Sequence, residues 1–253
     1  MLINLPFYNA PKQPINLGNF TIRATLGWEE KGSDFPVSVY GFETSKLPMH
    51  KKSPAWAMLE TPDNLIPSII YATTLDLLSN HWKYVFKRTV TLARPMTLDR
   101  ALDFIKVPRY NFTPSLINTF TRAIKFLSKE RKARIALQRW SSSYARQDSL
   151  DSVLDCCSAL EAAMNLPDEL RLRISLSAYH LLKRYKKQGF ALVYEMYGIR
   201  NSFIHGASFP EVDTNKQRSY IDVVAQILRR YIELGKIPSG DEMGKSILHQ
   251  FSP

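Results

Sequence analysis

The 253-residue sequence is poor in cysteine, in glycine and in long apolar runs. Its two cysteines, Cys156 and Cys157, are adjacent and cannot close a loop through a disulfide bridge, which indicates a reducing compartment. No stretch approaches the roughly 20 consecutive apolar residues that a membrane-spanning helix requires. The first residues also lack the basic and apolar regions of a secretory signal. We therefore expect a cytoplasmic protein that does not enter a membrane.

The motifs of most enzyme classes are missing as well. The ten glycines form neither a phosphate-binding loop nor a dinucleotide fingerprint. The sequence has no His-Glu-x-x-His zinc motif, no Cys-x-x-Cys pair and no Gly-x-Ser-x-Gly elbow around a nucleophilic serine. No metal ion and no cofactor are therefore expected.

Positive charge is the most unusual feature that is present. The chain has 34 Lys and Arg against 23 Asp and Glu, for a net charge of +11. Residues 83–146 hold 15 basic and three acidic side chains, whereas both flanking regions are close to neutral. Such a concentration indicates an anionic partner such as nucleic acid, although a solvated helix face is the structural alternative. The candidate binding residues are Arg122, Lys125, Lys129, Arg131, Lys132, Arg134 and Arg139.

The N-terminal region, residues 1–110, has the pattern of a small α+β fold. Frequent prolines separate short runs in which apolar and polar residues alternate, as in half-buried strands. We expect strands within 19–26, 36–42 and 84–92, and a helix within 64–82. The region could serve in sensing, gating or partner binding.

Residues 111–237 change to an apolar period of 3.6, which predicts an all-α bundle of four or five helices. The first helix is expected to start at Pro114, to bend before Ile135, and to end or kink at 141–143 or 147–149. Later helices are expected at 149–165, from Asp168 to about 185, at 190–205 and at 215–234. Residues 238–253 are expected to form a tail. The predicted fold class is therefore α+β, with a helical bundle after a smaller α+β region.

The third of these later helices, 190–205, ends in the candidate catalytic residues. In Arg200-Asn201-Ser-Phe-Ile-His205-Gly206, Asn201 and His205 are four residues apart and share a helix face. A guanidinium can hold a phosphate oxygen and stabilise developing negative charge, and imidazoles transfer protons near neutral pH. Gly206 is expected to close the helix in the left-handed conformation. A purely structural role for Arg200, as a residue that forms a salt bridge and caps the helix end, stays open.

Residues 192–206 resemble the Arg-x4-6-His signature of the HEPN superfamily, and its Apea-like branch in particular. The segments 154–164 and 170–178 are similar to two further helices of that branch. The similarity covers roughly 112–235 and does not extend to residues 1–110.

The resemblance implies a metal-independent endoribonuclease that acts as a homodimer through the signature helix. Arg200 and His205 would be its catalytic pair, and Asn201 the polar residue that follows the arginine. In this scheme the ribose 2′-hydroxyl attacks the adjacent phosphate and leaves a 2′,3′-cyclic phosphate. Such domains recur in bacterial antiphage and toxin systems. Some have lost catalysis, so a regulatory module that only binds RNA or a protein partner is the second hypothesis.

Glu161 is a further residue for which we expect a structural role. Glu161 lies in an apolar helical stripe, where an unpaired carboxylate would be costly, so we expect a structural salt bridge to Arg171 or Arg173. His180 lies beside apolar residues and is also interpreted as structural.

Three aspartates and two tyrosines have structural interpretations as well. A divalent cation could bind to the carboxylates of Asp148, Asp151 and Asp155. We prefer the interpretation that these aspartates lie at a helix N-terminus, where negative charge is favourable. Tyr194 and Tyr197 flank the signature, and packing at a bundle or dimer seam is preferred to base stacking. The adjacent cysteines are interpreted as core residues.

Overall fold

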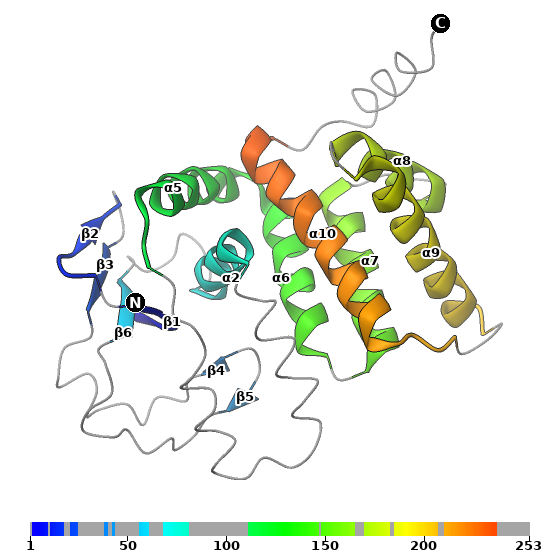
Figure 1. Cartoon of the computed structure of the whole chain (residues 1–253), viewed down its shortest axis with the longest axis horizontal. Coiled ribbons are helices and arrows are strands. Elements are labelled where there is room, and N and C mark those ends of the chain that lie inside the picture. The colour runs from blue at the N-terminus through cyan, green and yellow to red at the C-terminus, as the bar shows by residue number, and fades with distance from the viewer. Residues whose placement is uncertain are drawn as a thin grey trace, which may run out of the picture. The chain divides into compact units, whose positions relative to one another are not determined.

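The computed structural model describes residues 2–9, 11–17, 21–24, 38–39, 42–43, 56–60, 68–80, 111–146, 148–164, 170–182, 185–206 and 210–236 (Figure 1). The chain divides into two compact units, Met1–Thr121 and Arg122–Pro253, and each is described by itself. The division falls within helix α5 (Pro114–Lys129), whereas the sequence predicts a boundary after residue 110. The strand expected in 84–92, the helix start at Asp168 and the tail 238–253 lie outside the described residues.

The described part of the first unit contains short antiparallel strands. Four of them make one sheet in the order β1-β6-β3-β2, and β4 pairs with β5. The strands are β1 (Leu2–Asn9), β2 (Ile15–Asn16), β3 (Thr21–Ala24), β4 (Ser38–Val39), β5 (Phe42–Glu43) and β6 (Trp56–Glu60). β1 contains Pro6 and lies at the edge of its sheet, where a missing backbone N–H is tolerated. The strands expected within 19–26 and 36–42 are confirmed, in shorter form.

The helix expected within 64–82 is confirmed as α2 (Ser68–Ser79), which contacts β1. Ile70, Leu75 and Leu77 of this helix are buried. Thr74 donates its hydroxyl proton to the Ile70 carbonyl, 2.6 Å away, which satisfies a buried polar group within the helix. The described part of this unit thus contains both strands and a helix.

The second unit is a helical bundle, as predicted. Its complete helices are α6 (Arg131–Ala145), α7 (Ser149–Met164), α8 (Leu170–Leu181), α9 (Lys186–Ile204) and α10 (Thr214–Leu234). α6 packs on α7, α8 packs on α9, and α10 contacts all four (Figure 1). Among the described residues, no helix is both long enough and apolar enough to cross a lipid bilayer.

Large aromatic side chains build the core of the bundle. Trp140 of α6 is fully buried, meets Tyr144 edge-on and donates its indole N–H to the Ile221 carbonyl of α10, 3.2 Å away. Tyr197 of α9 donates its hydroxyl proton to the Cys157 carbonyl of α7, 3.2 Å away. Both bonds satisfy a buried polar group while its ring fills the core, so they fix how α10 and α9 lie against α6 and α7.

One predicted helix boundary is confirmed and another differs. Of the two places predicted for the end of the first helix, 141–143 and 147–149, the second agrees with the structure, since α6 ends at Ala145 and α7 begins at Ser149. The serines at 141–143 lie inside α6, where Ser143 donates its hydroxyl proton to the Trp140 carbonyl at 2.7 Å. α8 ends at Leu181 and α9 already begins at Lys186, earlier than the expected 185 and 190. The bend expected before Ile135 is confirmed as the break between α5 and α6 at Glu130.

Asp148 is the N-cap of α7, and its removal should lower stability. The Asp148 carboxylate accepts the N–H groups of Leu150 and Asp151 at 2.8 and 2.9 Å. Asp148→Ala is expected to lower the free energy of unfolding by about 1 kcal/mol, measured by urea denaturation. Asp151→Ala removes a charge from the same helix turn but no such acceptor, so it is the matched control. Equal losses in the two variants would contradict the cap.

Candidate functional site

The signature residues lie at the C-terminal end of α9. The backbone N–H of His205 donates to the Asn201 carbonyl at 3.0 Å, and that of Gly206 to the Phe203 carbonyl at 3.1 Å. Gly206 has a φ of +66°, so the predicted left-handed helix end is confirmed. A side chain at Gly206 would be strained in this conformation. The backbone thus ends the helix at a defined point, directly after His205.

Arg200 points from α9 toward α7. Its Nη2 lies 3.6 Å from Oε1 of Glu161, and its Nη1 donates to Oδ1 of Asn201 at 3.1 Å. The side chains of Arg200 and Glu161 are 26% and 30% exposed, so the ion pair is only partly screened by solvent. The salt bridge predicted for Glu161 is therefore present, but its predicted partners, Arg171 and Arg173, were wrong.

The geometry of α9 explains this partner. At about 100° per residue, Arg200 falls on the same side of the helix as Val193, Met196 and Tyr197, which are buried. That side faces α7, and Glu161 lies one helical turn after Cys157, whose carbonyl binds Tyr197. The two arginines of α8 were predicted because they follow Glu161 closely in sequence, whereas the helix packing selects α9.

His205 points in another direction from Arg200. The two residues are five positions apart, which separates them by about 140° around the helix. His205 is exposed, and within the described part of the chain its imidazole has no hydrogen bond or ion pair. The structure thus brings Arg200 and Asn201 together, while His205 lies on the solvent side of the same helix end. One chain by itself does not direct both side chains at one point.

The last two turns of α9 are only partly buried by the rest of the chain. Each residue from Gly198 to Gly206 is half-buried or exposed, in contrast to the buried Tyr197 just before them. Three of them are apolar, and Ile204 is 51% exposed. An exposed apolar segment that also carries the signature is suited to contact with another chain. The prediction that Tyr197 packs in the bundle is confirmed.

Burial keeps nearby ionisable groups neutral. Burial raises the pKa of Cys156 to about 12 and the pKa of Cys157 well above its usual value. It also raises the pKa of the Tyr197 hydroxyl, and the nearby Glu161 raises it further. These thiols are therefore not nucleophiles at neutral pH, and their interpretation as core residues is confirmed. Burial, with Lys186 and Arg230 nearby, lowers the pKa of His180.

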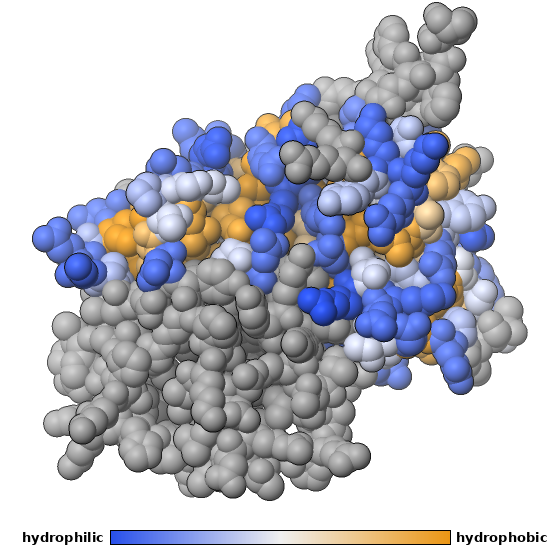
Figure 2. All heavy atoms as spheres, viewed as in Figure 1, coloured by the Kyte–Doolittle hydropathy of each residue, from blue (hydrophilic) through white to orange (hydrophobic). Residues whose placement is uncertain are grey.

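The candidate nucleic-acid surface follows α5 and α6, neither of which contains an acidic residue. Figure 2 shows hydrophilic side chains along α5 beside a hydrophobic strip. Five of the seven predicted cations are exposed and have no partner within the described part of the chain. These five, which we call the cationic row, are Arg122, Lys125, Lys129, Arg131 and Lys132.

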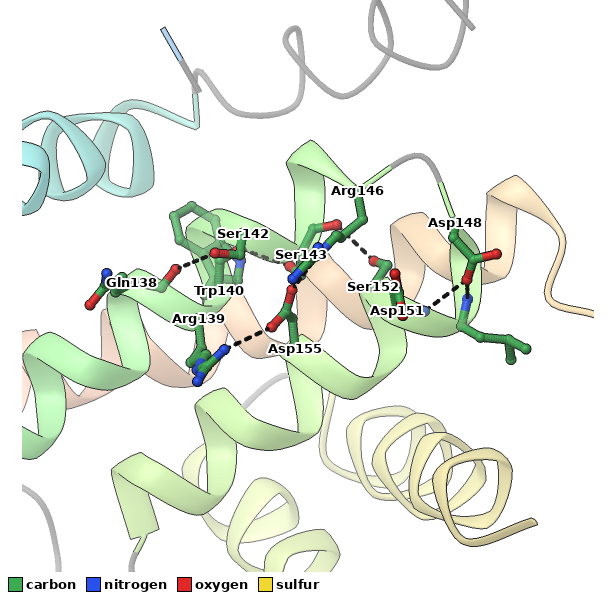
Figure 3. Close-up of polar contacts among 11 residues, drawn as sticks. Gln138, Arg139, Trp140, Ser142, Ser143, Arg146, Asp148, Asp151, Ser152 and Asp155 are labelled. Carbon is green, nitrogen blue, oxygen red and sulfur yellow. Dashed lines mark hydrogen bonds and ion pairs between the residues drawn. The ribbon is translucent and has the colours of Figure 1, made fainter. Parts of the chain in front are cut away.

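The other two predicted binding residues have structural contacts. Arg134 donates from Nη1 to the carbonyls of Leu127 and Ser128, at 2.6 and 3.2 Å, and so caps the end of α5. Arg139 lies 3.5 Å from the carboxylate of Asp155, which Arg146 also binds at 2.8 Å (Figure 3). The ion pairs of Asp155 hold α6 to α7. Because Arg134 and Arg139 already have these structural contacts, they are weaker candidates for binding RNA.

Two of the three aspartates, Asp148 and Asp155, have structural contacts. Asp148 caps α7, and the buried Asp155 forms ion pairs with Arg139 and Arg146 (Figure 3). Among the residues that the structure describes, no group of three or more His, Cys, Asp or Glu could hold a metal ion. The helix-start interpretation of Asp148 is confirmed.

Sequence reasoning missed a cluster formed by α8 and α9. Arg171 donates from Nε to the Tyr194 carbonyl at 3.0 Å, and its Cζ lies 3.7 Å from the centre of the Tyr194 ring. Tyr194 stacks on Phe190 with 5.7 Å between ring centres. Arg173, expected to be structural, is exposed and its side chain pairs with no described residue. Of the two glycines inside α9, Gly198 is the one that could have indicated a close approach here.

Comparison with known protein families, with curated proteins and with solved structures found no match for this chain.

Proposed function

We propose that the chain is a HEPN-type, metal-independent endoribonuclease whose catalytic residues are Arg200, Asn201 and His205. The observation that carries the proposal is the end of α9, where an arginine oriented by two partners and an unengaged histidine flank an exposed helix end. The resemblance of this segment to the HEPN signature supplies the reaction class. By the same resemblance, the chain would act in antiphage defence or in a toxin system.

The site requires two copies of the chain. Arg200 and His205 point about 140° apart around α9, so one chain cannot direct both at the same phosphate. A homodimer that pairs the exposed ends of α9 would bring the histidines of the two copies to a shared cleft. Ile204 and the other apolar residues of that segment would lose their exposure in this contact, which favours association.

The reaction is an internal transesterification. The 2′-oxygen of a ribose bonds to the adjacent phosphorus while the bond from phosphorus to the 5′-oxygen breaks. One proton leaves the 2′-hydroxyl and one is added to the departing 5′-oxygen, and His205 performs one of these transfers. Arg200 stabilises the negative charge on the pentavalent phosphorus group. The products are a 2′,3′-cyclic phosphate and a 5′-hydroxyl.

RNA would reach the site along the cationic row. Its five exposed cations have no intramolecular partner in the described chain, so binding a phosphate does not require breaking a salt bridge. The repulsion between neighbouring cations on α5 and α6 would be relieved in the complex.

The test uses single-stranded RNA with a chelator present. We expect cleavage without divalent ions, products with 2′,3′-cyclic phosphate ends, and no cleavage at positions that carry 2′-deoxyribose. A double variant, Arg200→Ala with His205→Ala, purified in the same way, should be inactive. Equal cleavage by the folded double variant would show that a contaminant is responsible and would refute the proposal.

A second candidate function is a non-catalytic module that binds RNA or a regulatory protein. The ion pair between Arg200 and Glu161 favours it, because a structural arginine would have the same partner. This candidate predicts salt-dependent RNA binding and no cleavage at any concentration of the chain.

Replacing Glu161 distinguishes the two candidates. If Arg200 is catalytic, Glu161→Gln is expected to lower kcat by about 10-fold with little change in KM, because the guanidinium loses one of its two partners. The matched control is Glu195→Gln, which breaks the exposed 2.7 Å ion pair between Glu195 of α9 and Lys216 of α10. Steady-state cleavage rates measure both. Unchanged kcat in Glu161→Gln would contradict an orienting role.

A further inference from the structure

Arg171 is held on the surface of α9 in one orientation. Its Nε donates to the Tyr194 carbonyl at 3.0 Å, and its guanidinium carbon lies 3.7 Å above the centre of the Tyr194 ring. The Tyr194 ring also stacks on the Phe190 ring, with the two ring planes 11° apart. A guanidinium on an aromatic face keeps its edge available for hydrogen bonds.

Gly198 provides the third contact. A Cβ at this position would lie 3.0 Å from Nη2 of Arg171 and 3.4 Å from its Cζ. The guanidinium therefore rests directly over the glycine, at a distance that a larger residue would not allow without displacement. Neither Nη group of Arg171 has a hydrogen-bond partner within the described part of the chain.

The cluster and the signature share one face of α9. Tyr194, Gly198, Asn201 and His205 are spaced by four, three and four residues, which places them within about 60° of one another around the helix. Gly198 and His205 are seven residues apart, or about 10 Å along the axis. Arg200 lies outside this face, on the side of α7. Arg171, rather than Arg200, is thus the arginine on the same side as His205.

The charges on this face suit an anion. α8 contains no acidic residue, and the single acidic residue of α9, Glu195, is occupied by Nζ of Lys216 at 2.7 Å. The Tyr194 ring already contacts the Arg171 guanidinium and the Phe190 ring, so its aromatic contacts lie within the cluster. What the cluster offers to a ligand is the free edge of one oriented guanidinium, which matches two oxygens of a phosphodiester.

We propose that Arg171 is a phosphate-binding residue for RNA, which holds a phosphate next to the one that reacts at His205. Because Gly198, which the guanidinium covers, and His205 lie about 10 Å apart along the helix axis, we place the two phosphates at neighbouring positions of a strand that extends along α9 from Gly198 toward His205. This inference rests on the proposed function for the identity of the reacting phosphate. The contacts to Tyr194 and Gly198 pre-order the side chain, which lowers the entropy that binding would otherwise cost.

The experiment measures binding of a fluorescent single-stranded RNA by anisotropy at fixed salt. All variants are made in the His205→Ala chain, so that cleavage does not interfere. Arg171→Lys keeps the positive charge but loses the two parallel N–H donors of the guanidinium, and it is expected to weaken binding by about 10-fold. Arg173→Lys, an exposed position on the same helix, is the matched control and should bind like the parent.

A second variant keeps every charged residue. Gly198→Ala adds the Cβ that displaces the guanidinium, and it is expected to weaken binding by about threefold. The same change should raise the midpoint of thermal unfolding, because alanine favours the helix over glycine. Weaker binding in a more stable protein would support the proposal, since loss of structure could not explain it.

Three outcomes would overturn the inference. One is binding by Arg171→Lys within twofold of Arg173→Lys, and another is unchanged binding by Gly198→Ala. The third is an equal loss of affinity for poly-glutamate and for RNA in Arg171→Lys, which would indicate an acidic protein as the ligand. Failure of the proposed function would give a different result. The chain with His205 intact would not cleave RNA, while Arg171→Lys would still weaken RNA binding.

Discussion

Cleavage of single-stranded RNA by His205→Ala is expected to be about 10²–10⁴-fold slower than cleavage by the unchanged chain, because the variant loses its proton-transferring group. The affinity for RNA should stay the same, since the cationic row is untouched. Folding should also be preserved, because His205 is exposed and its described hydrogen bond comes from the backbone N–H. Single-turnover cleavage and anisotropy measure the two effects independently.

The control for this experiment is the other histidine that the structure describes. His180→Gln replaces a half-buried imidazole on α8. Burial lowers the pKa of this imidazole, and the nearby charges of Lys186 and Arg230 lower it further. It should cleave at the rate of the unchanged chain. A comparable loss in both histidine variants would indicate a general effect on folding. A His205→Ala rate within threefold of the unchanged chain would exclude this residue as the proton carrier.

The helices of the bundle could be predicted from sequence because each carries its own signals. An apolar period of 3.6 marks α5, α6, α7 and α10, and glycines at 206 and 235 mark two helix ends with left-handed backbone. The break between α8 and α9 was misplaced because no proline or glycine occurs from 181 to 188. Where local signals are absent, packing decides the boundary, and a sequence pattern cannot locate it.

The sheet of the first unit was predicted only in part. β6, with the sequence WAMLE, contains mostly residues that favour helices, and β1 is interrupted by Pro6. These strands depend on pairing between distant segments, since Leu2 lies opposite Glu60. Strand formation of this kind follows from tertiary pairing more than from local preference.

The candidate site shows the same limit. The signature residues were identified from their spacing and from the resemblance to the HEPN superfamily, and the helix end at Gly206 was identified from the glycine itself. The partner of Glu161 and the position of Arg171 depend on how α7, α8 and α9 cross, which sequence spacing does not report. Charge counting likewise located the basic segment but could not separate the exposed cations from Arg134 and Arg139, whose contacts form only in the folded bundle.

Neutralising the cationic row is expected to weaken RNA binding by about 10²–10³-fold near physiological salt. The variant replaces all five residues with glutamine, and each replacement removes about 0.7 from the slope of log affinity against log salt for a single strand. The full loss of slope, about 3.5, is reached if every one of the five contacts a phosphate. Titrations at several salt concentrations give both the affinity and the slope. The five residues are Arg122, Lys125, Lys129, Arg131 and Lys132.

The fold should tolerate this change. The five side chains are exposed and make no contact with a partner in the described chain, and their removal relieves repulsion along α5 and α6. The matched control is the double variant Arg134→Gln with Arg139→Gln, in which the helix cap and the Asp155 salt bridge are lost. We expect the control to lose stability more than affinity, and the neutralised row to lose affinity more than stability. If the two variants showed the opposite order, the distinction between binding and structural cations would be wrong, and RNA would have to approach along another face.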